Sequence, residues 1–148
     1  MANLQTLLTE ATKLSREIER ILKASTYNAY GDLSELDIDT SDGEQIFLRD
    51  ELNFIMDRLA DAQSRIKYLN LPLGKTTRLH RNACGQYETA EGDCLHCGSP
   101  LEALIADEYR DVPYWTRTRL EHDGTDYYLA GHSKTSLDGL IVRMRTRD

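Results

Sequence analysis

Apolar residues recur every three or four positions over two long segments of this chain, and that spacing places them on one face of an α-helix. The segments span about residues 3–24, with Asn3 as the expected N-cap, and residues 48–69. Because neither stripe can stay in water, the sequence predicts an antiparallel helical hairpin. A second copy of the chain, or its C-terminal part, could also cover the stripes, so a coiled-coil homodimer through the hairpin stays open. The stripes consist of Leu4, Leu7, Leu8, Ala11, Leu14, Ile18, Ile21 and Leu22, and of Leu48, Leu52, Ile55, Met56, Leu59, Ala62, Ile66 and Leu69.

The pattern changes after residues 71–74, where a Pro and a Gly end the helical repeat and short alternating runs begin. We therefore place a helical domain at residues 1–73 and a small β domain at residues 74–148. Strands are expected at residues 76–81, 86–89, 114–122, 127–130 and 140–145, and Asp123-Gly124 predicts a hairpin turn. Residues 100–107 favour a short helix with Ser99 as N-cap, with a strand at residues 101–105 as the alternative. The predicted fold class is α+β, with an antiparallel barrel or strongly bent sheet in the second domain.

Composition excludes several classes of protein. The longest apolar runs are only a few residues, so we expect no membrane span and no membrane partner. The N-terminal residues lack the pattern of a secretion signal, which predicts a cytoplasmic protein. Eighteen basic and 25 acidic residues give a net charge of −7, which argues against coating nucleic acid by bulk attraction to phosphates.

Three cysteines lie close together, and their spacing predicts a structural zinc site. Cys94 and Cys97 form a Cys-x-x-Cys turn followed by a Gly, while Cys84 and His80 lie a short distance upstream. Tetrahedral zinc accepts such a Cys3His set, and His96 is the rival fourth ligand. Reduced cysteines packed as small apolar residues are the alternative of equal weight. Because four protein ligands leave no position for water, such a zinc would not be catalytic.

The connection between the two predicted helices is acidic and contains no basic residue between positions 25 and 45. Residues 37–43 resemble the start of an EF-hand calcium loop, but Asp42 stands where that loop needs Gly and Leu48 where it needs Glu. A solvated acidic loop is the simpler interpretation. A third interpretation is that the carboxylates bind a basic groove of a protein that handles nucleic acid. The candidate partner-binding residues are Asp32, Glu35, Asp37, Asp39, Asp42 and Glu44.

The β domain offers a different candidate surface, since basic and aromatic residues alternate along its predicted strands. Such a face could stack on bases or contact phosphates, which would make the protein a nucleic-acid-binding regulator. Nearby carboxylates could instead neutralise the face as cross-strand pairs. The residues concerned are Arg117, Arg119, Arg143 and Arg145, with Trp115 and Tyr127. No acid–base or nucleophile constellation assembles from the sequence, so we expect no enzyme.

Four segments of the second half, residues 79–87, 97–102, 115–128 and 136–140, resemble a family of small uncharacterised domains. These domains are carried by plasmids, phages and conjugative elements of Gram-positive bacteria. The resemblance carries over no active site, and in that family the positions of Cys84 and Cys94 need not be cysteine. It implies an accessory or anti-defence role, including that of an anti-CRISPR protein. The leading hypothesis is therefore a non-enzymatic interaction protein that inhibits a nucleic-acid-handling effector through its acidic connection.

Overall fold

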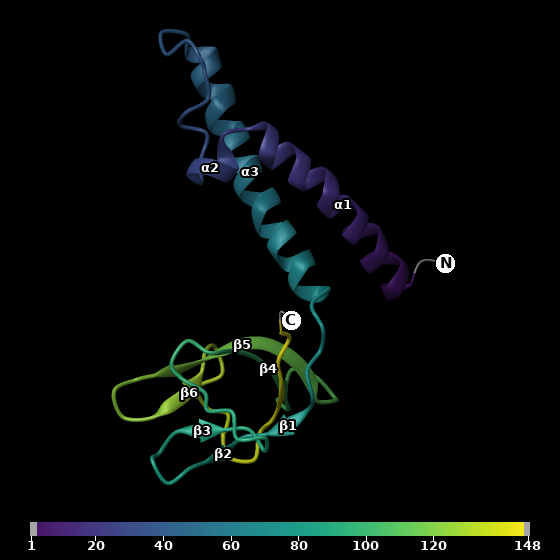
Figure 1. The fold of residues 1–148 in the computed structure, drawn as a ribbon, viewed down its shortest axis with the longest axis vertical. Helices are drawn as coiled ribbons and strands as arrows, with labels where there is room; N and C mark the ends of the chain where they lie inside the picture. Colours follow the sequence, from purple (N-terminus) through teal and green to yellow (C-terminus); the bar gives the residue numbers. More distant parts are fainter. Residues whose placement is uncertain (1–2, 147–148) are drawn as a thin grey trace. The chain divides into compact units, whose positions relative to one another are not determined.

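The computed structural model describes residues 3–146, which divide between Leu71 and Pro72 into two compact units. The first unit is helical and the second is an antiparallel β unit, as Figure 1 shows, so the predicted α+β class is confirmed. Within the described residues, none of the helices combines the length and hydrophobicity that crossing a membrane requires.

The helical unit contains α1 (Leu4–Ala24), the single-turn α2 (Tyr27–Tyr30) and α3 (Gly43–Leu69). The side chain of Asn3 caps α1 by accepting a 2.8 Å hydrogen bond from the backbone N–H of Thr6, as the sequence predicts. The second long helix begins earlier than its apolar stripe because Asp42 caps it, accepting a 3.0 Å hydrogen bond from the N–H of Glu44.

The two long helices run antiparallel and enclose a small apolar core. Ile18 and Leu22 of α1 meet Met56 of α3, and Leu33 of the connection completes the buried cluster. The connection is fastened to α3 at two points: the N–H of Leu33 donates to Asn53 over 2.7 Å, and the hydroxyl of Tyr27 donates to Asp57 over 2.6 Å. Figure 1 shows α1 and α3 closest near the end of α1 and further apart toward its start.

Much of the two apolar stripes lies outside this core. The side-chain amide of Gln63 donates to Glu19, and that of Asn70 donates to Thr12 over 3.0 Å, so polar contacts close one side of the helix pair. Large apolar side chains remain exposed on both helices. From the predicted stripes, these are Leu4, Leu7, Leu14 and Ile21 on α1, and Leu48, Leu52, Ile55 and Leu69 on α3.

The β unit has a five-stranded antiparallel sheet in the order β1-β7-β4-β5-β6 and a separate two-stranded sheet, β2-β3. The strands are β1 (Thr77–Arg78), β2 (His80–Arg81), β3 (Tyr87–Glu88), β4 (Pro100–Ile105), β5 (Tyr114–His122), β6 (Tyr127–Leu129) and β7 (Ile141–Arg143). The predicted strand at residues 114–122 is confirmed, as is the turn at Asp123-Gly124, where Gly124 takes a φ of +94° between β5 and β6. One core gathers residues of both sheets, including Tyr87, Leu101, Leu120 and Val142.

For two features of the β domain, the structure decides between alternatives that the sequence left open, and it confirms the strand alternative at residues 101–105. Residues 100–105 form β4 rather than a helix, because this segment pairs with β5 on one side and β7 on the other, and Leu101, Ala103 and Ile105 are fully buried. Ser99 does not cap a helix; its hydroxyl accepts a 2.9 Å hydrogen bond from the N–H of His96. The sheet also does not close into a barrel, since β1 and β6 form its two edges within the described residues.

The buried position of Leu120, near the C-terminal end of β5, gives a stability prediction. We expect Leu120→Ala to lower the free energy of unfolding of the β unit by about 2–5 kcal/mol, because it removes apolar contacts and leaves a cavity. Urea denaturation followed by the fluorescence of Trp115, the single tryptophan, measures this change. Val112→Ala, at an exposed position of the same unit, is the matched control and should change stability by less than about 0.5 kcal/mol. Equal effects of the two substitutions would contradict the packing described.

Candidate functional site

The acidic connection (residues 25–45) is ordered by its own carboxylates. Asp32 accepts hydrogen bonds from the N–H and the hydroxyl of Ser34, at 2.9 and 2.6 Å. Asp39 makes the same pair of contacts with Ser41, at 3.0 and 2.6 Å. These hydroxyl and amide donors stabilise the charged form, so the pKa of Asp32 and that of Asp39 lie below the usual aspartate value. With Asp42 capping α3, three of the six predicted partner-binding carboxylates have fixed positions.

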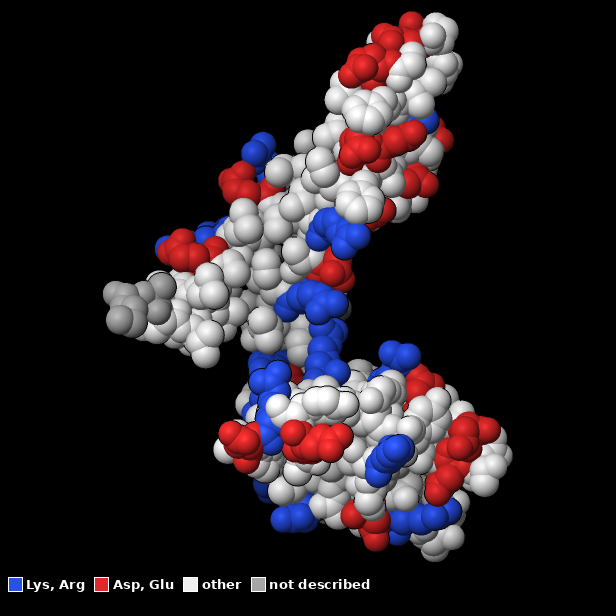
Figure 2. All heavy atoms as spheres, turned by 180° about the vertical axis from the view of Figure 1, so that it is seen from behind, with Lys and Arg blue, Asp and Glu red and all other residues white. Residues whose placement is uncertain are grey.

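The charge of these six carboxylates is not balanced by neighbouring cations. Among the ion pairs of residues 3–146, none joins any of the six to a Lys or Arg. Carboxylates elsewhere in the same unit are paired: Glu10 with Lys13, Glu17 with Arg20, and Asp61 with Arg65. Figure 2 shows acidic side chains gathered at one end of the helical unit, where the connection lies. The structure thus brings the predicted partner-binding residues onto one segment that carries net negative charge.

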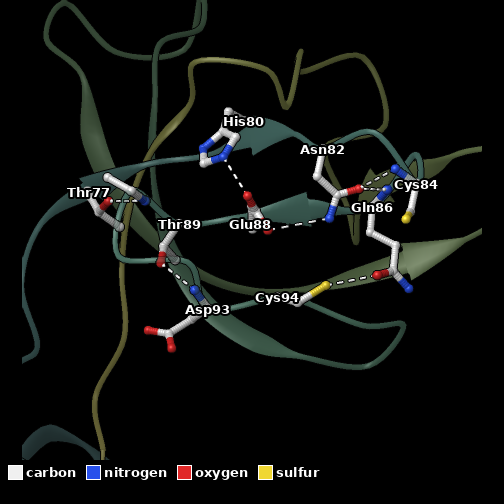
Figure 3. Close-up of polar contacts among 10 residues, drawn as sticks. Thr77, His80, Asn82, Cys84, Gln86, Glu88, Thr89, Asp93 and Cys94 are labelled. Carbon is white, nitrogen blue, oxygen red and sulfur yellow. Dashed lines mark hydrogen bonds and ion pairs between the residues drawn. The ribbon is translucent and has the colours of Figure 1, made fainter.

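Three of the four predicted zinc ligands have other side-chain partners, and Figure 3 shows those of His80 and Cys94. His80 lies opposite Glu88 in the β2-β3 pair, and its Nε2 is 2.8 Å from the glutamate Oε1. The thiol of Cys94 donates to Gln86 Oε1 over 3.0 Å, and that of Cys97 donates to Glu121 over 3.6 Å, while Cys84 is exposed.

The described part of the chain contains no group of three or more His, Cys, Asp or Glu side chains placed to hold a metal ion. His96, the rival ligand, is exposed and makes a backbone contact with Ser99. Zinc binding by His80, Cys84, Cys94 and Cys97 therefore stays a prediction, and it would require the thiols of Cys94 and Cys97 to leave their present acceptors.

Glu88 joins the two strands of the small sheet through its side chain. One carboxylate oxygen contacts His80, and the other accepts a 3.4 Å hydrogen bond from the amide of Asn82. The hydrogen bond with His80, followed by that with Asn82, holds the pKa of Glu88 below its usual value. The same carboxamide group of Asn82 also orders the turn between the strands, since its oxygen accepts from the N–H groups of Cys84 and Gln86 at 2.9 and 3.0 Å.

This contact predicts an acid dependence of stability. Because the pKa of Glu88 is lower in the folded than in the unfolded chain, its stabilising contribution is complete above the usual glutamate pKa of 4.5 and is lost as the pH falls through the lower folded value. We expect the melting temperature of the β unit to fall on acidification below about pH 4.5, and to fall less in Glu88→Gln. Thermal unfolding between pH 6 and pH 3 checks this. Glu108→Gln, at an exposed position, should keep the acid dependence of the parent; identical profiles for all three proteins would refute the assignment.

The side chain that most organises the β unit is Glu102, which sequence reasoning did not single out. It is only 5% exposed, and its two oxygens accept hydrogen bonds from Nε of Arg143 and Nε of Arg145, each at 2.7 Å. The guanidinium of Arg143 also lies 4.0 Å from the centre of the Trp115 ring. Charged hydrogen bonds from two arginines compensate the loss of hydration that burial imposes on the carboxylate. In the sequence, the one indication of this cluster is that Glu102 is the single acidic residue inside the otherwise apolar run 101–105.

These contacts occupy much of the predicted nucleic-acid surface. The side chains of Arg143 and Arg145 are 19% and 17% exposed and are held by Glu102. Arg119 pairs with Glu121, whose pKa this contact lowers, and the ring of Tyr127 packs edge-on against His122 and Tyr87. Neutralisation of this face thus comes from Glu102 across the strands and from Glu121 within β5, and nucleic-acid binding by this face stays a prediction.

Removing the carboxylate charge tests the importance of this cluster. Glu102→Gln leaves two partly buried guanidinium groups without their anion, so we expect the free energy of unfolding of the β unit to fall by about 3–5 kcal/mol. Glu121→Gln makes the same chemical change in a more exposed pair and should cost about 1 kcal/mol or less. Urea denaturation compares the two variants. A small effect of Glu102→Gln would show that the sheet does not depend on the cluster.

The geometry defines this chain as an α+β protein that joins a helical unit with an acidic connection to an antiparallel β unit built around a buried Glu–Arg cluster. Residues 76–144 match the model of a domain of unknown function, DUF5348. The match contains all seven strands, and the helical unit lies outside it. No curated protein and no solved structure matches the chain. This match confirms that the second half of the chain resembles a family of uncharacterised domains, whereas a link to mobile elements stays a prediction.

Proposed function

We propose that this chain is a non-catalytic interaction protein whose acidic connection binds a basic surface of a protein partner. The observation that carries the proposal is the set of six carboxylates that pair with no Lys or Arg in residues 3–146. Unbalanced charge of one sign on a protein surface attracts a surface of the opposite sign and speeds their association.

The local structure of the connection favours binding. Asp32, Asp39 and Asp42 are held by hydrogen bonds within their own turns, so ordering them on a partner costs little conformational entropy. The lowered pKa of Asp32 and that of Asp39 keep both groups ionised at neutral pH. Glu35, Asp37 and Glu44 are exposed and have no role in these turns, so their charges are available to a partner.

The partner class that suits this surface is a protein with a basic groove for nucleic acid. The resemblance of the β unit to domains of mobile elements suggests the finer version: an inhibitor of a CRISPR effector that acts in the cytoplasm by occupying its nucleic-acid channel. The predicted homodimer concerns a different surface of the helical unit, the exposed stripes of α1 and α3.

The test neutralises three carboxylates that are not the acceptors in the turns of Asp32, Asp39 and Asp42; because Glu44 lies in the first turn of α3, circular dichroism checks that the variant keeps this helix. The triple variant Glu35→Gln, Asp37→Asn, Glu44→Gln removes three negative charges and leaves the capping aspartates in place. We expect the parent protein to inhibit target-DNA cleavage by a CRISPR effector complex from a Gram-positive bacterium, and the triple variant to need about tenfold more protein for equal inhibition. Co-elution of protein and effector at increasing salt measures the same contact, and should weaken as salt screens the charges.

A matched control removes the same charge from the β unit, through Glu108→Gln, Asp111→Asn and Asp138→Asn, three exposed positions. This control should inhibit as the parent does. Equal inhibition by the parent and the acidic-connection variant would show that the charge of the connection is not used. Loss of inhibition in both triple variants would show that only net charge matters.

A further inference from the structure

We propose that the helical unit pairs with a second copy of itself through the exposed apolar stripes of α1 and α3. The eight large side chains of these stripes are between 36% and 86% exposed in the single chain. Isolated exposed apolar residues are common on proteins, but a continuous row of them over two helices marks an interaction surface.

The spacing of the rows is that of a coiled-coil seam. On α1 the positions 4, 7, 11, 14, 18 and 21 alternate steps of three and four, and on α3 the positions 48, 52, 55, 59, 62, 66 and 69 do the same. Ile18, Leu59 and Ile66 belong to the core within the hairpin, whereas the other large members of both rows extend beyond it. Each row is therefore longer than the contact that the hairpin makes with itself.

Both rows lie on the same side of the helix pair. The polar contacts of Glu19 with Gln63 and of Thr12 with Asn70 occupy one side of the contact between α1 and α3. At about 100° per residue, Leu14 lies about 140° around α1 from Glu19, and Ile55 lies about 80° around α3 from Gln63, so both turn away from these polar contacts. The hairpin thus presents one two-helix apolar face, which is half of a four-helix bundle.

The charges beside the rows identify a second copy as the occupant. At the same edge position of the seven-residue repeat, α1 carries Glu10 and Glu17, and the C-terminal half of α3 carries Arg58 and Arg65. Within one chain Glu10, Glu17 and Arg65 make exposed ion pairs with Lys13, Arg20 and Asp61, and exposed pairs of this kind contribute little, so contacts with a second copy can replace them. Both pairs are seven residues apart, so when α1 of one copy packs antiparallel on α3 of the other, Glu10 meets Arg65 while Glu17 meets Arg58. In a dimer with two-fold symmetry each of these contacts occurs twice, so the surface of one copy is complementary to the same surface of the other. Further toward the start of α3 the same edge carries Glu44 and Glu51.

The first experiment measures the mass of the full chain by sedimentation equilibrium at micromolar concentrations. We expect a dimer of twice the 16.9 kDa chain mass, and an increase of about 100-fold in its dissociation constant in Leu14→Gln, Ile55→Gln. The matched control is Tyr109→Gln, Val112→Gln, which changes two exposed apolar side chains of the β unit. The control should dimerise as the parent does.

Exchanging the charges at the proposed dimer contacts gives a second test. Circular dichroism checks that every variant keeps its helices. Glu10→Lys, Glu17→Lys alone and Arg58→Glu, Arg65→Glu alone should each weaken the dimer, and the four changes together should restore it. A monomeric parent at about 100 μM would overturn the proposal, as would a dimer weakened only by the control changes in the β unit. A monomer whose stripe variants alter hydrogen exchange in the β unit would also overturn it, because the β unit would then cover the face. Five of the six acidic-connection carboxylates precede α3, and the inhibition assay does not measure the mass of the protein, so failure here leaves the proposed function standing.

Discussion

A buried carboxylate between two arginines constrains the whole β unit. Because Glu102 is almost without solvent, its charge must be met by fixed donors, and the donors come from β7 and the residues that follow it. In the sheet, Glu102 lies opposite Arg143 on one neighbouring strand and opposite Arg117 on the other. A shift of β7 by one residue would turn Arg143 and Arg145 to the other face and remove both of these hydrogen bonds from the carboxylate. The ionic cluster therefore favours the observed register of β7 against β4.

The helical unit is organised by a much weaker constraint. Its fully apolar core consists of four buried side chains, and hydrogen bonds of Leu33 and Tyr27 with α3 hold the connection in place. A core of this size leaves most of a long amphipathic helix without a partner. The unit is thus built to be completed by contacts outside itself, with apolar residues along its length and unbalanced negative charge at the connection.

Periodicity alone was sufficient to predict the long helices and the longest strand. It was insufficient for segments whose conformation depends on tertiary contacts. The helices, the cap at Asn3 and the strand at residues 114–122 follow from local pattern and turn chemistry. The segment 100–105 has helix-forming residues and a good N-terminal signal, but strand neighbours on both sides outweigh local propensity. The cysteine spacing is compatible with zinc, yet side-chain direction depends on strand pairing, which sets His80 against Glu88. The partners of Glu102 are about 40 positions away in the chain, so spacing could not reveal them.

The two units have separate buried clusters, which have no residue in common. The family match spans residues 76–144 and contains the whole buried cluster of the β unit. Such an arrangement makes the units separable in evolution. A gene fusion could attach the same β unit to a different N-terminal segment without disturbing the Glu102 cluster, and mutations that retarget the helical unit would leave that cluster under its own selection.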